Sequence, residues 1–167
     1  PPPDELAKAL HGKITQHHRF LMPLPLAPIA AADRSVALLD VQLEEQTRPL
    51  AEEVRLLEDM PGMSRTSACV VLAEIGADMS RFPSQRHLVS FAGLCPGLNQ
   101  SAGKSRSSKL KKGSNWLKTV MVSCAWAAAR SKNTYARAQF HRLKARRGSK
   151  KAVVAVAASM LTAIYFV

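Results

Sequence analysis

The stretch "SNWLKTVMVSCAWAAAR", residues 114–130, is apolar on nearly every side of a helix. Ser114 at its start is a favoured N-cap residue, because its hydroxyl can accept a hydrogen bond from a free backbone N–H of the first turn. A helix that is hydrophobic all round is a buried helix. The stretch therefore predicts the central helix of a core, around which the other elements pack.

Cap and turn residues divide the rest of the chain into further helices, and no segment shows convincing strand alternation. We expect Ser84 to cap a short helix that ends at Gly93. We also expect Asn133 to cap the helix in "TYARAQFHRLKARRG" and Ser149 to cap a last, apolar helix. The predicted fold class is all-α, with about six helices that surround a polar loop of roughly 20 residues.

A seven-residue repeat of apolar side chains precedes this core, formed by Val36, Leu43, Leu50 and Leu57. The spacing predicts one seam of a coiled coil or of a helix packed on a partner. The alternative is an amphipathic helix that lies on its own domain. Pro49 should kink or break the helix, and Thr47 should cap the piece that follows.

The stretch "LLEDMPGMSRTSACVVLAEIG", residues 56–76, ends one helix at a Pro-Gly turn and starts an apolar helix almost at once. This is the pattern of a helix-hairpin-helix, whose turn directs backbone amides and a helix N-terminus at a phosphate. Ser64 stands where such hairpins usually have a second glycine. A tight connection between two core helices is therefore nearly as well supported.

Three segments are expected along the chain. Residues 1–32 form a linker and the start of a helical arm, residues 33–59 a coiled-coil-like helix, and residues 60–167 a helical domain with a long polar loop at 94–113. Because the chain has no initiator Met and stops inside an apolar run, we expect it to be a piece of a longer protein. Its longest uncharged stretch, residues 152–167, falls short of the roughly 20 residues of a membrane-spanning helix, so no membrane partner is expected. The cysteines have no metal-ligand spacing and indicate a reducing, cytoplasmic protein: Cys69, Cys95 and Cys124.

Charge is divided unevenly between the two halves of the chain. All 12 acidic residues precede residue 79, whereas residues 79–167 contain 17 lysines and arginines and no Asp or Glu. A block of one sign repels itself unless it meets a polyanion, and nucleic acid is the commonest polyanion in a cell. This half also cannot hold a catalytic metal with carboxylates. If it cuts or joins a phosphodiester, it must use a side-chain nucleophile or metal ligands from elsewhere.

The polar loop combines hydroxyl groups with positive charge. A loop of this length inside a compact domain is usually functional or disordered. Ala102 and Gly103 follow Ser101 and would let a phosphate approach closely, but composition alone leaves other serines open: Ser105, Ser107, Ser108 and Ser114. The cations that could stabilise a serine alkoxide and a phosphoryl group are Lys104, Arg106, Lys109, Lys111 and Lys112. Further along, the candidates for nucleic-acid binding on one helical face are Arg130, Arg137 and Lys144, with His141 as an alternative to Arg130.

Four short motifs make the chain recognisable: "AGLCPG", "SAGK", "KKGSNWL" and "AWAAAR". From about His17 to its end, the chain resembles the coiled coil and C-terminal serine domain of the bridge-RNA-guided insertion-sequence transposases (recombinases), the family numbered one hundred and ten among insertion sequences. Members of that family carry a RuvC-like domain in front of these parts, and this chain has no counterpart of it. Gln100 precedes the serine of "SAGK" where an acid is common.

The resemblance implies an activity and partners. It implies that Ser101 is the nucleophile, which forms a covalent link to DNA during excision and insertion. It implies DNA, a structured guide RNA and a homo-oligomer, dimer or tetramer, as partners of a bacterial, nucleoid-associated protein. No cofactor is expected in this chain, and Mg is expected in the absent RuvC-like domain. The alternative function is a non-catalytic helical module for nucleic-acid binding and multimerisation, whose loop only grips phosphates.

Overall fold

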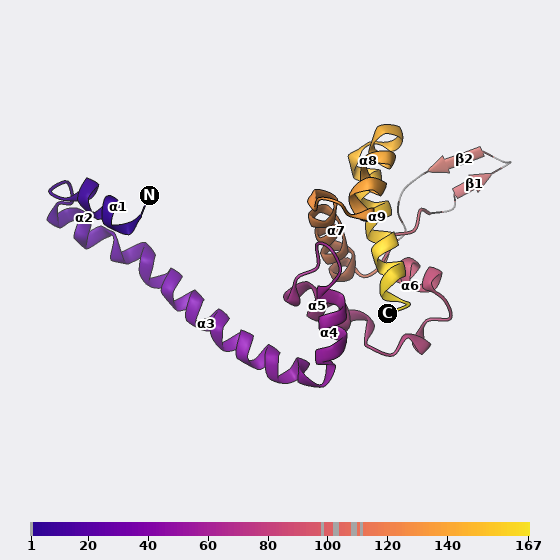
Figure 1. The fold of residues 1–167 in the computed structure, drawn as a ribbon, viewed down its shortest axis with the longest axis horizontal. Coiled ribbons are helices and arrows are strands. Elements are labelled where there is room, and N and C mark those ends of the chain that lie inside the picture. The colour runs from indigo at the N-terminus through magenta and orange to yellow at the C-terminus, as the bar shows by residue number, and fades with distance from the viewer. Residues whose placement is uncertain (1, 98, 102–103, 108–109, 111) are drawn as a thin grey trace. The chain divides into compact units, whose positions relative to one another are not determined.

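The computed structural model describes residues 2–97, 99–101, 104–107, 110 and 112–167, with the backbone alone at 99–101 and 104–107. The chain divides into two compact units, Pro1–Arg48 and Pro49–Val167 (Figure 1). Apart from two short strands, the regular structure of the described residues is helical, which confirms the expected all-α class.

The first unit consists of three helices, α1 (Pro3–Leu10), α2 (Gln16–Leu21) and α3 (Pro23–Thr47). A capping box starts α2, in which Thr15 Oγ1 accepts a hydrogen bond from the His18 backbone and the Thr15 N–H donates to His18 Nδ1 at 3.2 Å. No residue of α3 is buried. The exposed large apolar side chains of α3 are those of Leu24, Leu26, Ile29, Val36, Leu38, Leu39 and Val41. This helix therefore presents an apolar surface that its own unit does not cover.

The helical path is interrupted at Pro49, as expected, because the 3-10 helix η1 (Arg48–Leu50) separates α3 from α4 (Ala51–Glu58). The cap expected from Thr47 is wrong. Its Oγ1 donates back to the carbonyl of Leu43 at 2.8 Å, since Pro49, two residues later, has no N–H to offer a cap. Leu57, the fourth residue of the predicted seam, is only 3% exposed and belongs to the core of the second unit. It is therefore unavailable to a partner.

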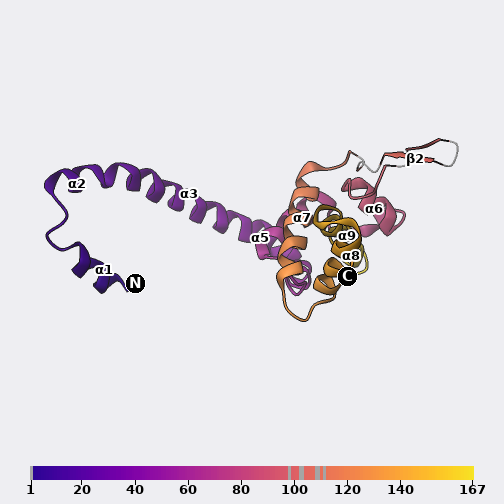
Figure 2. The same cartoon turned by 90° about the horizontal axis from the view of Figure 1, so that it is seen from above.

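The second unit is built around one central helix, α7 (Asn115–Arg130), as the opening stretch predicted. The other elements of this unit are α4, α5 (Arg65–Ile75), the 3-10 helix η2 (Met79–Arg81), α6 (Gln85–Phe91), α8 (Tyr135–Arg147) and α9 (Ser149–Ile164), and α6 packs against α9. α7 packs against α5, α8 and α9, and Figure 2 shows α7, α8 and α9 side by side. The residues that α7 buries are Leu117, Met121, Cys124, Ala125, Ala128 and Ala129. The small alanines let the neighbouring helices approach closely.

The helix caps confirm two of the predicted positions and correct two. Ser114 caps α7 by accepting from the Leu117 N–H, and Ser84 occupies the N-cap position of α6, although no cap hydrogen bond forms from its side chain. Thr134, and not Asn133, caps α8. Asn133 instead turns the chain with a φ of 58°, a left-handed conformation that Asn tolerates better than most residues. Gly148 occupies the N-cap of α9 with a φ of 81°, and Ser149 is the first helical residue.

The Pro-Gly turn between α4 and α5 lies against the central helix. Gly62 has a φ of 84°, and a Cβ atom there would overlap the backbone of α7 at Cys124 and Ala128. Ser64 caps α5 by accepting from the Ser67 N–H. These contacts are those of a tight connection between core helices, whereas phosphate binding by this turn stays a prediction.

The apolar end of the chain belongs to the core. α9 has 16 residues and buries seven of them. Among the described residues, no helix combines the length and apolarity that a membrane span requires.

Candidate functional site

Within the predicted polar loop, the described backbone of residues 99–101 and 104–107 forms two antiparallel strands, here called the hairpin. Its strands are β1 (Asn99–Ser101) and β2 (Lys104–Ser107), and the register pairs Gln100 with Ser105 and Ser101 with Lys104. Residues 102 and 103, which join the two strands in sequence, lie outside the described residues. The hairpin places the backbone of the predicted nucleophile at its tip and in register with the backbone of a lysine.

Close backbone contacts hold the two ends of this segment together. Pro96 and Leu110 form an isolated antiparallel bridge below the hairpin. The Ser114 N–H donates to the Phe91 carbonyl at 2.9 Å. A Cβ atom on Gly113 would overlap the backbone of Gly93 and the Phe91 carbonyl oxygen, so only glycine fits at this position. The hairpin thus rises from a closed base on the helical core.

Ser114 connects this base to α5. Its Oγ accepts from the Leu117 N–H at 3.3 Å, which starts α7, and donates to Glu74 Oε2 at 2.7 Å. The role of Ser114 as a cap removes it from the serines that composition left open as nucleophiles. The partnership with Glu74 was not predictable, because 40 residues separate the two.

The structure describes only some of the cations predicted in the polar loop. Lys104 and Arg106 lie in β2, where the backbone is described, and Lys109 and Lys111 lie outside the described residues. Lys112 is exposed beside Gly113 at the base. The predicted role of these cations around Ser101 therefore stays a prediction.

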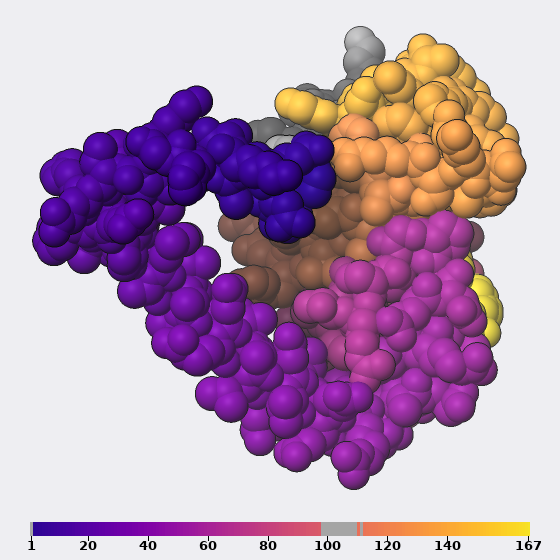
Figure 3. Space-filling model, turned by 60° about the vertical axis from the view of Figure 1, so that its left-hand side comes forward, coloured from indigo at the N-terminus to yellow at the C-terminus, as the bar shows by residue number. Residues whose placement is uncertain are grey.

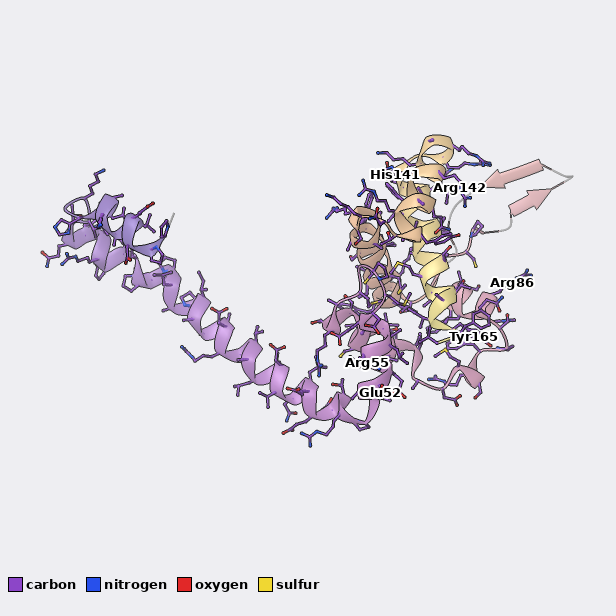
Figure 4. All side chains as sticks on the ribbon, in the orientation of Figure 1. Glu52, Arg55, Arg86, His141, Arg142 and Tyr165 are labelled. Carbon is purple, nitrogen blue, oxygen red and sulfur yellow. The ribbon has the colours of Figure 1, made fainter. Side chains whose placement is uncertain are left out.

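A second cationic region lies where α7 and α8 meet. A groove of about 340 Å³, here called the α7–α8 groove, is lined by Trp126, Ala129, Arg130, Arg137, Phe140 and His141. Arg137 Nη1 donates to the Arg130 carbonyl at 3.4 Å, which brings these two predicted residues together. Lys144 lies further along α8, with its Nζ 5.9 Å from the centre of the Phe140 ring. Figure 4 labels His141 and Arg142, neighbours in sequence on α8.

The charge environment of this groove differs from that of α4. On α4, Arg55 Nε lies 3.4 Å from Glu52 Oε2 (Figure 4). By contrast, α7, α8, the segment that joins them and α9 contain no Asp or Glu. In Figure 3, the surface formed by α7 and α8 appears in orange tones above the magenta surface of α5. The positive charge of the groove is therefore not neutralised by carboxylates of its own helices.

Cys124 lies in the core of the second unit. Burial raises the pKa of the Cys124 thiol, so the group is a neutral thiol near neutral pH, 3.6 Å from the sulfur of Met63. In the part of the chain that the structure describes, no group of three His, Cys, Asp or Glu side chains is placed to hold a metal ion.

Comparison with known proteins assigns the chain to a family. The model of the Transposase IS116/IS110/IS902 family matches residues 54–142, just over half of the 167 residues, and the chain belongs to this family. The match runs from α4 through the hairpin to the middle of α8.

One curated relative extends the comparison. The protein named "Putative transposase y4qE" from Sinorhizobium fredii (strain NBRC 101917 / NGR234) is 35% identical to this chain over 79 residues. The aligned part is 46% of this chain and 20% of that protein. The chain therefore matches about one fifth of the length of this relative.

Proposed function

We propose that this chain is the part of a DNA transposase that supplies a serine nucleophile, Ser101, and binds the DNA backbone around it. The observation that carries the proposal is the position of Ser101 at the tip of a hairpin, in register with Lys104, on a base closed by Gly93 and Gly113. Membership of the transposase family supports DNA as the substrate. The 17 lysines and arginines of residues 79–167 support contact with its phosphates.

The proposed reaction exchanges one phosphodiester for another. The oxygen of the Ser101 hydroxyl bonds to the scissile phosphorus and its proton leaves to a base or to solvent. The bond from phosphorus to the 3′ oxygen breaks, and that oxygen takes up a proton as a free 3′ hydroxyl. A 5′-phosphoserine link remains. The 3′ hydroxyl of another DNA end reverses the step, so no external energy source is required.

The lysines and arginine near Ser101 have a defined part in this reaction. A serine hydroxyl is a weak nucleophile at neutral pH, and cations stabilise both its alkoxide and the charge that develops on the phosphoryl oxygens. Lys104 and Arg106 within the hairpin and Lys112 at its base are suited to this by charge and position in the chain. A divalent metal in a RuvC-like domain would add Lewis-acid stabilisation when bound, and residues 79–167 have no carboxylate of their own to hold it. Arg130, Arg137 and Lys144 would contact DNA phosphates further from the reacting bond.

Guidance by a structured RNA and assembly into a dimer or tetramer complete the proposed function. The test requires the chain joined to its RuvC-like domain and supplied with guide RNA, donor and target DNA and a divalent cation. Ser101→Ala should abolish strand exchange while DNA binding remains, because it removes one oxygen. Ser105→Ala and Ser107→Ala, on the neighbouring strand, are matched controls and should retain most of the activity. Strand exchange by Ser101→Ala would refute the proposal.

A non-catalytic role is the second candidate, and the exposed apolar surface of α3 favours it. A helix that its own unit does not cover is suited to multimerisation. In that case the hairpin would only grip phosphates, and every serine variant of the hairpin would exchange strands as well as the unaltered protein. Covalent attachment of DNA to the chain separates the two candidates.

A further inference from the structure

The α7–α8 groove combines a fixed aromatic surface with arginine side chains. The ring centres of Trp126 and Phe140 lie 5.4 Å apart, with 61° between the ring planes, an edge-to-face contact. Phe140 is 6% exposed and forms the floor of the groove, whereas Trp126 is half-buried. The indole ring is therefore held in place by packing and keeps part of its surface accessible to a ligand.

Arg137 is held in place by a hydrogen bond, and neither arginine of the groove is neutralised by a carboxylate of its own helices. The hydrogen bond from Arg137 Nη1 to the Arg130 carbonyl directs this guanidinium toward the C-terminal end of α7. The remaining N–H groups of Arg137 and the exposed side chain of Arg130 face a region whose helices contain no carboxylate. Guanidinium groups bind phosphates through paired hydrogen bonds. The groove thus offers a stacking surface and a phosphate-binding group within one site.

We propose that the α7–α8 groove binds an unpaired nucleotide of a single DNA strand, with its base against Trp126 and its phosphate on Arg137 and Arg130. The volume of about 340 Å³ is suited to one small ligand, since pockets for larger organic ligands extend to about 1,000 Å³. Stacking needs a free π-face, which a base in a duplex does not offer to a side chain. This inference deepens the proposed function, on which it rests, by naming the form of DNA that the domain holds away from the reacting bond.

Membership of the transposase family favours DNA over RNA as the strand that the groove binds. The lining itself does not exclude RNA, because the N–H groups of its arginines could donate to a 2′ hydroxyl. The test must therefore distinguish binding of single-stranded RNA at this groove from binding of single-stranded DNA.

The chain contains two tryptophans, so fluorescence can report on the groove alone. Trp116→Phe replaces the other tryptophan, which is 74% exposed at the start of α7, and leaves Trp126 as the only indole. Oligothymidylate of about 12 nucleotides should quench the emission of Trp126, since stacking sites bind strands of roughly this length. Duplex DNA and oligouridylate of equal length should quench it at least several-fold more weakly. No quenching by oligothymidylate, or equal or tighter binding of either alternative, would overturn the proposal.

Matched variants test the two contacts separately. Arg137→Gln should weaken binding of oligothymidylate about 10-fold, because it removes a paired phosphate contact. Arg146→Gln removes the same charge from the same helix, nine residues later and about 180° around it, and should weaken binding no more than about 2-fold. Trp126→Leu should weaken binding roughly 5- to 100-fold, measured by anisotropy of a labelled strand, while Trp126→Phe should retain most of it. If Arg137→Gln and Arg146→Gln lower the affinity for oligothymidylate equally, the strand is bound by general electrostatic attraction, and the proposed site is refuted.

Failure of this inference and failure of the proposed function give different results. Ser101 lies outside the groove, so Ser101→Ala should leave the quenching of Trp126 emission by oligothymidylate unchanged. Quenching without any covalent DNA–serine link would retain the groove and refute the nucleophile. A covalent link without quenching would retain the nucleophile and refute the groove. Circular dichroism of each variant checks that the helical content of the chain is unchanged.

Discussion

The hydroxyl of Ser114 and the carboxylate of Glu74 are joined by a hydrogen bond of 2.7 Å across 40 residues of sequence. The same hydroxyl accepts from the Leu117 N–H, so one side chain starts the central helix and ties it to α5. The neighbouring residue, Gly113, closes the base of the hairpin against Gly93. The base of the proposed catalytic segment is therefore next to a part-buried contact between α5 and the start of α7.

Ser114→Ala should lower the free energy of unfolding by about 1–3 kcal/mol, because it removes a helix cap and leaves Glu74 without this partner. Chemical denaturation followed by circular dichroism measures the change. Ser123→Ala makes the same replacement at an exposed site within α7 and should change stability by less than about 0.5 kcal/mol. A double-mutant cycle with Glu74→Ala should give a coupling energy of at least about 0.5 kcal/mol. Additive effects of the two changes would contradict the role assigned to this hydrogen bond.

Gly113→Ala should disturb the base of the hairpin, since the added methyl group overlaps backbone atoms that have no rotamer to change. Overpacking of this kind typically costs about 1–3 kcal/mol of stability, and strand exchange should fall with it. Thermal unfolding and the exchange assay provide the two measurements. Asn115→Ala, an exposed residue two positions later, is the control. Wild-type stability in Gly113→Ala would show that the chain ends are not packed as described.

The apolar surface of α3 predicts self-association. Val36 is 55% exposed, and Leu43 is seven residues further along the same helix. Val36→Asp with Leu43→Asp should yield a folded monomer, because charges cannot be buried in the seam without a partner. Sedimentation velocity of the chain and of a control with the same added charge, Gln42→Asp with Gln46→Asp, gives the comparison. A monomeric unaltered chain at high concentration would contradict the prediction.

Binding of duplex DNA by this chain should depend strongly on salt and weakly on sequence. Each phosphate that a lysine or arginine neutralises contributes about −0.9 to the slope of log affinity against log salt concentration. With several contacts, affinity should fall by orders of magnitude between about 50 and 200 mM salt. Fluorescence anisotropy on two unrelated duplexes measures both properties. An affinity that hardly changes over this range would argue against phosphate contacts by the basic half.

Local signals in the sequence predicted the parts of the fold that depend on local interactions. Apolar residues on nearly every side of the helix at 114–130 identified it as the central helix. Ser114 identified its start, because an N-cap side chain bonds to the backbone within one helical turn. The caps of α8 and α9 were each misplaced by one residue, since neighbouring Asn, Thr, Gly and Ser residues are all acceptable there.

Long-range contacts account for what the sequence did not predict. Nothing local shows that Glu74 meets Ser114 or that Leu57 leaves the seven-residue pattern for the core. The hairpin strands are short and polar, so they lack the apolar alternation that identifies a strand. Arg130 and Arg137 were expected on one face, but the groove also depends on the packing of Trp126 against Phe140.

The central claim is that Ser101 bonds covalently to DNA, and mapping of the linked residue tests it most directly. The complete transposase, with guide RNA, a divalent cation and a donor DNA that traps the cleaved state, is denatured and digested with protease and nuclease. Mass spectrometry of the residual nucleotide adduct should place a 5′-phosphoserine bond on the peptide that contains Ser101, and Ser101→Ala should abolish the adduct. An adduct on Ser105, Ser107 or Ser108, or one that persists in Ser101→Ala, would contradict the account.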